Sequence, residues 1–232
     1  MDFDLSPLWI SLKIAAVSTI FTFFLGILFA RLVFPMKRFR FLIDSLLSLP
    51  MVLPPTVTGF FLLIIFGKNS TIGRFLASLG LQVLFTWQGA VIAAVIVSFP
   101  IMYITTMGAF QQMDTELIDA ARTIGYSERV IFFKVWLPLS WPGIAAGTTL
   151  SFARALGEFG ATIMIAGNLP GKTRTMSIAV YSSMQGGNRE MAYVWVIIIM
   201  CLAFCMLALM NFWSSRRYTT DERINPDRRM RG

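Results

Sequence analysis

The chain has 232 residues, of which 56% are hydrophobic and only 14% are charged. Soluble domains carry about a quarter charged residues, so this composition excludes an ordinary soluble protein and indicates a chain embedded in lipid. The formal net charge is +8, but the basic residues are distributed among the ends of apolar runs, and we expect no nucleic-acid partner. There is no histidine, which removes most zinc sites and every histidine-dependent triad. We expect no metal, no cofactor and no catalytic residue.

Five apolar runs are each long enough for the about 20 residues that cross a bilayer. In chain order they cover residues 8–32, 41–66, 87–110, 139–166 and 191–213. Ser6 as N-cap and Pro7 in the first turn begin the first run. We predict an all-α membrane protein with one transmembrane domain over residues 8–213 and a polar, disordered tail over residues 214–232.

The basic residues are shared unequally between the two sides of these runs. Most follow the first, third and fifth runs, and fewer lie in the two remaining connections. Lysine and arginine accumulate in cytoplasmic segments, so we predict the N-terminus outside and the tail in the cytoplasm. The outer connections are then residues 67–86, with a short amphipathic element, and residues 167–189, with a short helix over 175–184.

The second run is interrupted in its middle by Pro50, Pro54 and Pro55. Each proline removes a backbone donor and crowds the preceding turn. Broken backbone at membrane depth is tolerated only beside protein or a water-filled cavity, so we expect residues 49–58 to face the protein interior. A kink that only improves packing is the open alternative.

A polar segment, residues 111–136, separates the third and fourth runs. Asp114 is placed to cap a helix, with Glu116 favourable in its first turn. Gly125 permits a left-handed turn, and Ser127 is placed to cap a second short helix. The helix between them has one apolar face, formed by Leu117, Ala120, Ala121 and Ile124. The segment predicts a helix-Gly-helix knob in the cytoplasm; the alternative is an amphipathic helix lying on the membrane.

The fourth run contains two charged residues, Arg154 and Glu158, which lie four apart and can pair on one helix face. A polar gate or anion path is one interpretation, and a buried pair that fixes helix packing is the one we favour. Thr148, Thr149 and Ser151 either line the same path or bond to their own helix backbone.

Residues 166–173 (AGNLPGKT) match a relaxed phosphate-binding loop. They follow a membrane span rather than a strand, fall on the predicted outer side, and have no separate magnesium-binding Asp. We therefore interpret them as a structural loop.

Two stretches of the polar segment carry a resemblance to a known family. Asp119-Ala120-Ala121 with Gly125, followed by Val135-Trp136-Leu137-Pro138, is similar to the "EAA" signature of importer permeases of the ABC (ATP-binding cassette) family. Residues 49–55, 151–162 and 170–175 resemble molybdate permeases of that family, and the similarity extends over about residues 9–213. Asp119 replaces the usual Glu, and Val135 replaces the usual Ile.

The resemblance implies the type I ABC importer permease fold, a homodimer in the bacterial inner membrane, a separate ATPase subunit, and an extracytoplasmic oxyanion-binding protein. It implies that the chain has no ATPase activity of its own. The implied ATPase-coupling residues are Glu116, Asp119, Ala120, Ala121, Gly125, Leu137 and Pro138. The candidate pathway residues are Pro50, Pro54, Pro55, Thr56, Thr148, Ser151, Arg154 and Glu158.

Several alternatives stay open at this point. Sulfate and tungstate permeases share much of the pattern. A channel or secondary transporter without an ATPase explains the apolar runs but not the knob. An intramembrane enzyme is disfavoured because the acidic residues are scattered, and a scaffold has no need of prolines in mid-membrane.

Overall fold

The computed structural model describes residues 4–36 and 38–224, and that part of the chain is helical without a strand. The helices are α1 (Ser6–Val33), α2 (Arg40–Val52), α3 (Pro55–Phe66), α4 (Thr71–Ser78), α5 (Trp87–Gln111), α6 (Thr115–Thr123), α7 (Glu128–Ile131), the π-helix η1 (Phe132–Trp136), α8 (Leu137–Leu156), α9 (Gly160–Ala166), α10 (Met176–Gln185) and α11 (Arg189–Ile224). Within the described residues, four segments are long and apolar enough to cross a membrane, and α2 with α3 forms a fifth, bent one. The all-α prediction is therefore confirmed.

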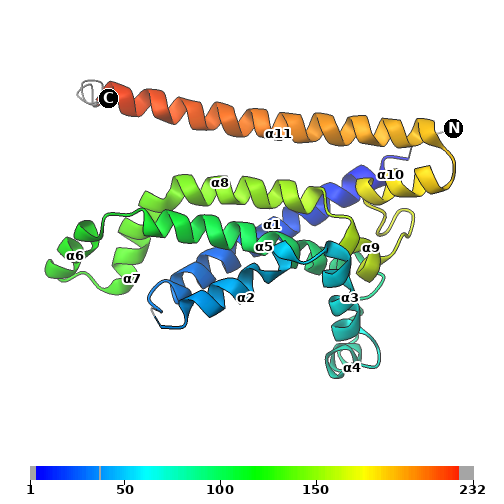
Figure 1. Ribbon diagram of the computed structural model, residues 1–232, viewed down its shortest axis with the longest axis horizontal. Helices are drawn as coiled ribbons and strands as arrows, with labels where there is room; N and C mark the ends of the chain where they lie inside the picture. The colour runs from blue at the N-terminus through cyan, green and yellow to red at the C-terminus, as the bar shows by residue number, and fades with distance from the viewer. Residues whose placement is uncertain (1–3, 37, 225–232) are drawn as a thin grey trace.

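The body of the molecule is formed by α1, α5 and α8, which pack along one another (Figure 1). α5 is the most enclosed span because it has neighbours on several sides. Small residues bring α5 and α8 close: a Cβ on Gly143 would lie 2.6 Å from the Cβ of Ala109. Such close approach is the usual basis of helix packing in lipid.

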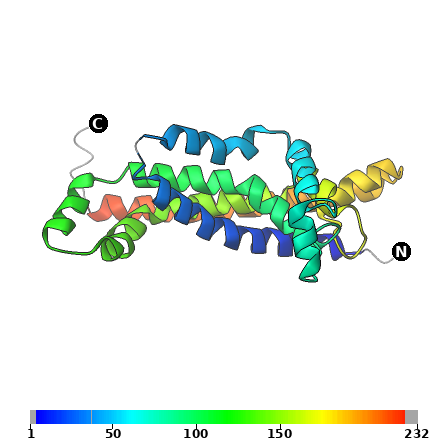
Figure 2. The ribbon, with the colours of Figure 1, turned by 90° about the horizontal axis from the view of Figure 1, so that it is seen from below.

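The ends of the bundle differ in what they carry. α6 and α7 project from one end, and the N-terminus lies at the other with α9 and α10 (Figures 1 and 2). The short helices expected in the connections 67–86 and 167–189 are present as α4 and α10. Near the N-terminal end, Lys13 Nζ lies 3.7 Å from the ring centroid of Trp87, so its charge is held against an aromatic face.

The predicted break in the second run is confirmed, whereas residues 49–58 are only partly enclosed in the single chain, where Thr58 is buried and most of the others are not. α2 and α3 meet at an angle of 106°. None of the 13 residues of α2, all of them described, is buried, and Val52 is 81% exposed. The reason is that α2 packs along α5 on one side only, and no other segment of the described chain covers its outer face.

The fourth run was expected as one helix over residues 139–166, and both of its ends differ. The helical segment begins at Glu128 and continues through η1 into α8. It ends at Leu156, where Gly157 precedes a short break before α9. The break is stabilised by Glu158, whose carboxylate accepts a hydrogen bond from the N–H of Ala161 at the start of α9.

The tail was expected to be disordered from residue 214, but α11 continues to Ile224. The sequence between Arg189 and Ile224 contains no glycine or proline to end the helix, whereas Pro226 follows shortly after. Residues 225–232 of the predicted tail lie outside the described residues.

Candidate functional site: the knob and the broken helices

The knob at the end of the bundle begins as its sequence predicts. The N–H of Glu116 donates to Asp114 Oδ1 over 2.9 Å, which caps α6. Glu116 lies exposed in the first turn of that helix, where a negative charge is favoured by the helix dipole.

Gly125 ends α6 in the left-handed conformation, with φ of 91°. The N–H of Gly125 donates to the carbonyl of Arg122 over 2.9 Å, and the N–H of Tyr126 to that of Ala121 over 3.2 Å. This pair of bonds is the Schellman arrangement, which satisfies carbonyls at a helix end. The left-handed turn expected from the sequence is thus confirmed, and it reverses the chain into α7.

The apolar face of α6 is divided between two environments, whereas one common face was expected. Ala121 is 8% exposed and packs with Ile118 into the core beneath the knob. Leu117 and Ile124 are 51% and 73% exposed, and Ala120 is exposed beside them. The division arises because residues 118 and 121 are one turn apart on the side turned toward the bundle. Leu117, Ala120 and Ile124 form what we call the outer strip.

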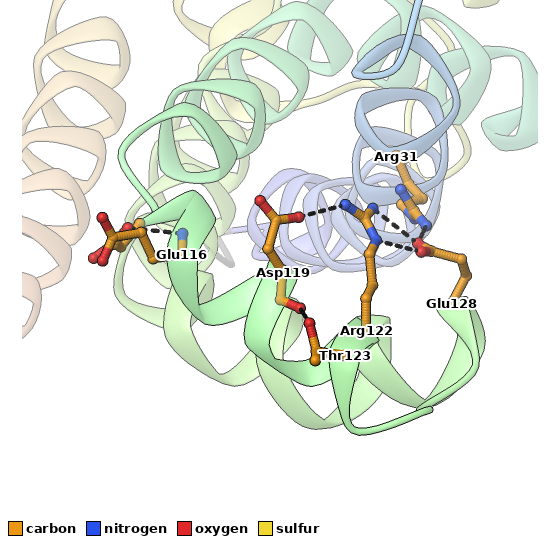
Figure 3. Close-up of polar contacts among 7 residues, drawn as sticks. Arg31, Glu116, Asp119, Arg122, Thr123 and Glu128 are labelled. Carbon is orange, nitrogen blue, oxygen red and sulfur yellow. Dashed lines mark hydrogen bonds and ion pairs between the residues drawn. The ribbon is translucent and has the colours of Figure 1, made fainter.

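A chain of ion pairs links the knob to α1 (Figure 3). Arg122 donates from Nη1 to Asp119 over 3.0 Å and from Nε to Glu128 over 2.7 Å. Glu128 also lies 3.4 Å from Arg31 Nη2, near the end of α1. The hydrogen bond to Glu128, followed by that to Asp119, raises the pKa of Arg122 above its ordinary value.

The Leu137-Pro138 pair explains how the knob joins the membrane domain. In an α-helix the N–H of residue 138 would bond to the carbonyl of Lys134. Pro138 has no N–H and its ring crowds that carbonyl, so the helix widens. Leu137 N–H bonds instead to the carbonyl of Phe132, five residues earlier, and closes the π-helix η1. Leu137 is half-buried and Pro138 is exposed.

The second helix of the knob was expected as a separate short helix capped by Ser127. Ser127 does precede α7, but its side chain makes no capping hydrogen bond. α7 is not separate either, because η1 passes without interruption into α8. The knob is thus continuous with a membrane span, which no single-residue signal in the sequence predicts.

The two interrupted spans meet at their breaks. A Cβ on Gly160 would lie 3.0 Å from the Cβ of Pro55 and 3.2 Å from the N of Thr56, so the start of α9 lies against the start of α3. Pro54 and Thr56 are exposed in the single chain, and Pro50 and Pro55 are half-buried.

Arg154 and Glu158 form the predicted ion pair, with Nη1 and Oε2 separated by 2.7 Å. Glu158 is 2% exposed, whereas the Arg154 side chain is 32% exposed. Because Glu158 also accepts from Ala161, the geometry fits the pair that fixes packing at the α8–α9 break.

The side-chain hydroxyls of Thr148, Thr149 and Ser151 on α8 each donate a hydrogen bond to a backbone carbonyl. Thr148 donates to the carbonyl of Ile144 and Thr149 to that of Ala145, as the helix-bonding alternative expects. Ser151 is fully buried and donates to the carbonyl of Ser98 on α5. Ser151 thus joins α5 to α8, because the two helices approach closely there, and its place on a pathway surface stays a prediction.

Comparison with known proteins places the chain in a family. Residues 22–217 match the family described as "Binding-protein-dependent transport system inner membrane component". The chain belongs to this family. The match runs from within α1 into α11, so the knob and most of the membrane domain of this permease lie inside it.

Two curated relatives of this permease share most of its length. The molybdenum transport system permease protein ModB of Escherichia coli (strain K12) is 42% identical, covering 89% of this chain and 91% of the relative. The sulfate transport system permease protein CysT of Salmonella typhimurium (strain LT2) is 35% identical, covering 89% of this chain and 75% of the relative.

A solved structure shares the fold of this permease. It is a bacterial ABC transporter involved in the import of the acidic polysaccharide alginate, with a TM-score of 0.76 and 17% identity, covering 91% of this chain and 79% of the other. The fold is that of the permeases of ABC importers, and the chain is a multi-pass membrane protein.

Reasoning from sequence did not single out three site residues of this permease: Arg31, Arg122 and Glu128. The spacing of Asp119 and Arg122, three apart on a helix, is a signal that could have identified the first pair. Arg31 and Glu128 are separated by 97 positions, and no local pattern joins them.

Proposed function

We propose that this permease forms the membrane path of an importer for molybdate, driven by ATP hydrolysis on a separate ATPase subunit that docks on the knob. An oxyanion-binding protein delivers the anion on the opposite side. The outer strip of the knob supports the proposal most strongly, because it is an apolar surface that the rest of the described chain leaves uncovered.

The composition of the outer strip suits a protein partner rather than lipid. Leu117 and Ile124 flank the small Ala120, which allows close approach of another backbone. Glu116 and Asp119 add negative charge at its edge, and Arg122 already holds Asp119 in place. An exposed apolar surface rimmed by charge is typical of an interaction site.

The knob is connected to the membrane interior by one continuous helical segment. It runs from Glu128 to Leu156 over 29 residues, a length of roughly 40 Å. It ends beside the Arg154–Glu158 pair and the α8–α9 break. A rotation of the knob by the ATPase would therefore be carried along this segment to the place where both interrupted spans meet.

The exposed break between α2 and α3 supports a path at the interface of two copies. Pro54 and Pro55 lack the N–H groups that would bond to the carbonyls of Pro50 and Met51. Such carbonyls are not tolerated against lipid tails. A second copy or a water-filled cavity must face them, and a homodimer with its path at this surface supplies both.

Molybdate is the substrate that the relatives favour, since the 42% identical protein is named a molybdenum permease and the 35% identical one a sulfate permease. Molybdate and sulfate are both tetrahedral oxyanions, so the second candidate substrate is sulfate. The geometry of the knob and of the break does not distinguish between the two anions.

The experiment is uptake of radiolabelled molybdate into liposomes that contain this chain, its ATPase subunit and its binding protein. We expect uptake that requires ATP and both partners and that withstands excess sulfate. Uptake without ATP would overturn the importer mechanism in favour of a channel or secondary transporter. ATP-dependent uptake that excess sulfate abolishes would overturn the substrate alone.

A further inference from the structure

We propose that Arg31 is a positioning residue that joins the knob to α1, so that α1 acts as a second strut between the knob and the opposite end of the bundle. The inference rests on the proposed function, because it concerns how motion of the knob reaches the membrane domain. It is independent of which oxyanion is carried.

The Arg31 guanidinium lies between a charge and two aromatic rings. Nη2 is 3.4 Å from Glu128 Oε2. The central carbon of the Arg31 guanidinium, Cζ, is 4.8 Å from the ring centroid of Trp136 and 5.4 Å from that of Phe132. A planar guanidinium can stack and bond in its plane at the same time, which a lysine ammonium does not do.

Trp136, one of the two rings beside the Arg31 guanidinium, is itself closely packed. Trp136 is 3% exposed, and its ring packs edge-on against Phe34, which directly follows α1, at 4.7 Å and Phe110 of α5 at 5.2 Å. Both Phe132 and Trp136 belong to the π-helix η1 that joins the knob to α8. Arg31 thus contacts the connection itself, at the place where the knob enters the membrane domain.

Glu128 is shared by two arginines from different elements. Arg122 holds it from α6 with Nε at 2.7 Å, and Arg31 holds it from α1. Without this carboxylate the two guanidinium groups would face each other as like charges. The side chains of Arg31 and Glu128 are 27% and 53% exposed, so the contact is partly wet and able to break and re-form during a transport cycle.

The far end of α1 is fixed to the other side of the bundle. The N–H of Met176, the first residue of α10, donates to Ser11 Oγ over 2.8 Å, and both residues are buried. α1 therefore connects the knob, through Arg31, with α10 in the connection 167–189 at the opposite end of the bundle (Figure 1). One route from the knob runs through α8, and this second route runs through α1.

The test measures molybdate transported per ATP hydrolysed in the reconstituted complex, for wild type, Arg31→Gln, Arg31→Lys, Glu128→Gln and the double variant Arg31→Gln/Glu128→Gln. For Arg31→Gln we expect continued ATP hydrolysis with transport per ATP lowered about fivefold or more, the usual lower bound of coupling between two sites. Arg31→Lys should recover only part of the loss. The double variant should be no worse than the more affected single variant, because each single variant already removes the Arg31–Glu128 contact.

Lys134→Gln is the matched control. Lys134 is an exposed cation of η1 without an ion-pair partner in the described part of the chain, and its removal should leave transport per ATP unchanged. Membrane insertion and the thermal unfolding temperature of each variant in detergent separate misfolding from uncoupling.

Wild-type transport per ATP in Arg31→Gln, or strictly additive losses in the double variant, would overturn the strut. If the wild-type complex itself fails to couple ATP to uptake, the proposed function fails first. The two failures are therefore distinguishable.

Discussion

Arg154 Nη1 and Glu158 Oε2 lie 2.7 Å apart across the last turn of α8, and the same carboxylate receives the N–H of Ala161. One buried carboxylate thus neutralises a membrane-embedded cation and begins the next helix. The break between α8 and α9 depends on both interactions of the Glu158 carboxylate, the ion pair with Arg154 and the hydrogen bond from Ala161.

Two replacements of Glu158 should therefore separate the contribution of its charge to stability from the contribution of its hydrogen bond with Ala161. Glu158→Ala leaves Arg154 without its partner and Ala161 without its acceptor, and we expect a loss of about 3 kcal/mol in the free energy of unfolding. Glu158→Gln keeps an acceptor for Ala161 and should lose less. Thermal unfolding in detergent checks the order, and equal stability of Glu158→Ala and wild type would contradict a structural role for the pair.

Gly125 should be replaceable only by residues that accept a positive φ. A Cβ there meets nothing within 4 Å in this chain, so losses arise from backbone strain or from the docked partner. Gly125→Val, with a β-branched side chain at φ of 91°, should abolish molybdate uptake without affecting membrane insertion. Gly125→Asn, which tolerates the left-handed region, should keep a measurable part of it. Wild-type uptake by Gly125→Val would show that the turn has no coupling role.

Tyr103 should hold α2 against the bundle. Its hydroxyl, on a residue only 1% exposed, donates to the carboxylate of Asp44, which also lies 3.3 Å from Arg40 Nε. Because α2 has no buried residue of its own, Tyr103→Phe should accelerate backbone hydrogen exchange in Arg40–Val52 while leaving α5 protected. The expected loss of stability is about 1.5–3 kcal/mol, the usual worth of a hydrogen bond to a charged group. Unchanged exchange in α2 would mean that its apolar contacts suffice.

Val52 should face a second copy or water rather than lipid tails. In a background with Cys201→Ser and Cys205→Ser, Val52→Cys should react with a water-soluble thiol reagent or form a cross-link between two copies. Phe204→Cys is the control that should do neither; Phe204 lies on α11 and is 73% exposed. A Val52→Cys that behaves like the control would contradict a path at the α2–α3 break.

The local features of this fold were predictable because each depends on one or two residues. Pro54 and Pro55 predicted the broken span, Gly125 the left-handed turn, Asp114 the start of α6, and the spacing of Arg154 and Glu158 their ion pair. Each rule acts within a few positions of the chain, so its outcome is independent of the tertiary arrangement.

The features that were missed depend on contacts between distant segments or on the absence of a stop signal. The hydrogen bond from Ser151 to the carbonyl of Ser98 was not predicted, because nothing in the local sequence around Ser151 indicates it. The partition of α6 into a buried and an outer face depends on where the bundle lies. Residues 214–224 were expected to be disordered because of their polar composition. They continue α11 because no glycine or proline interrupts the helix, and adding residues to a helix already formed is favourable.

The central claim is that the outer strip is the docking surface for an ATPase subunit. The most direct measurement places a photo-activatable amino acid at Ile124, which is 73% exposed, and identifies what it cross-links in the assembled complex. We predict a cross-link to the ATPase subunit from position 124, and none from the same amino acid at Phe204 on α11. A complex that transports molybdate but forms no ATPase cross-link at Ile124 or Leu117 would contradict the claim.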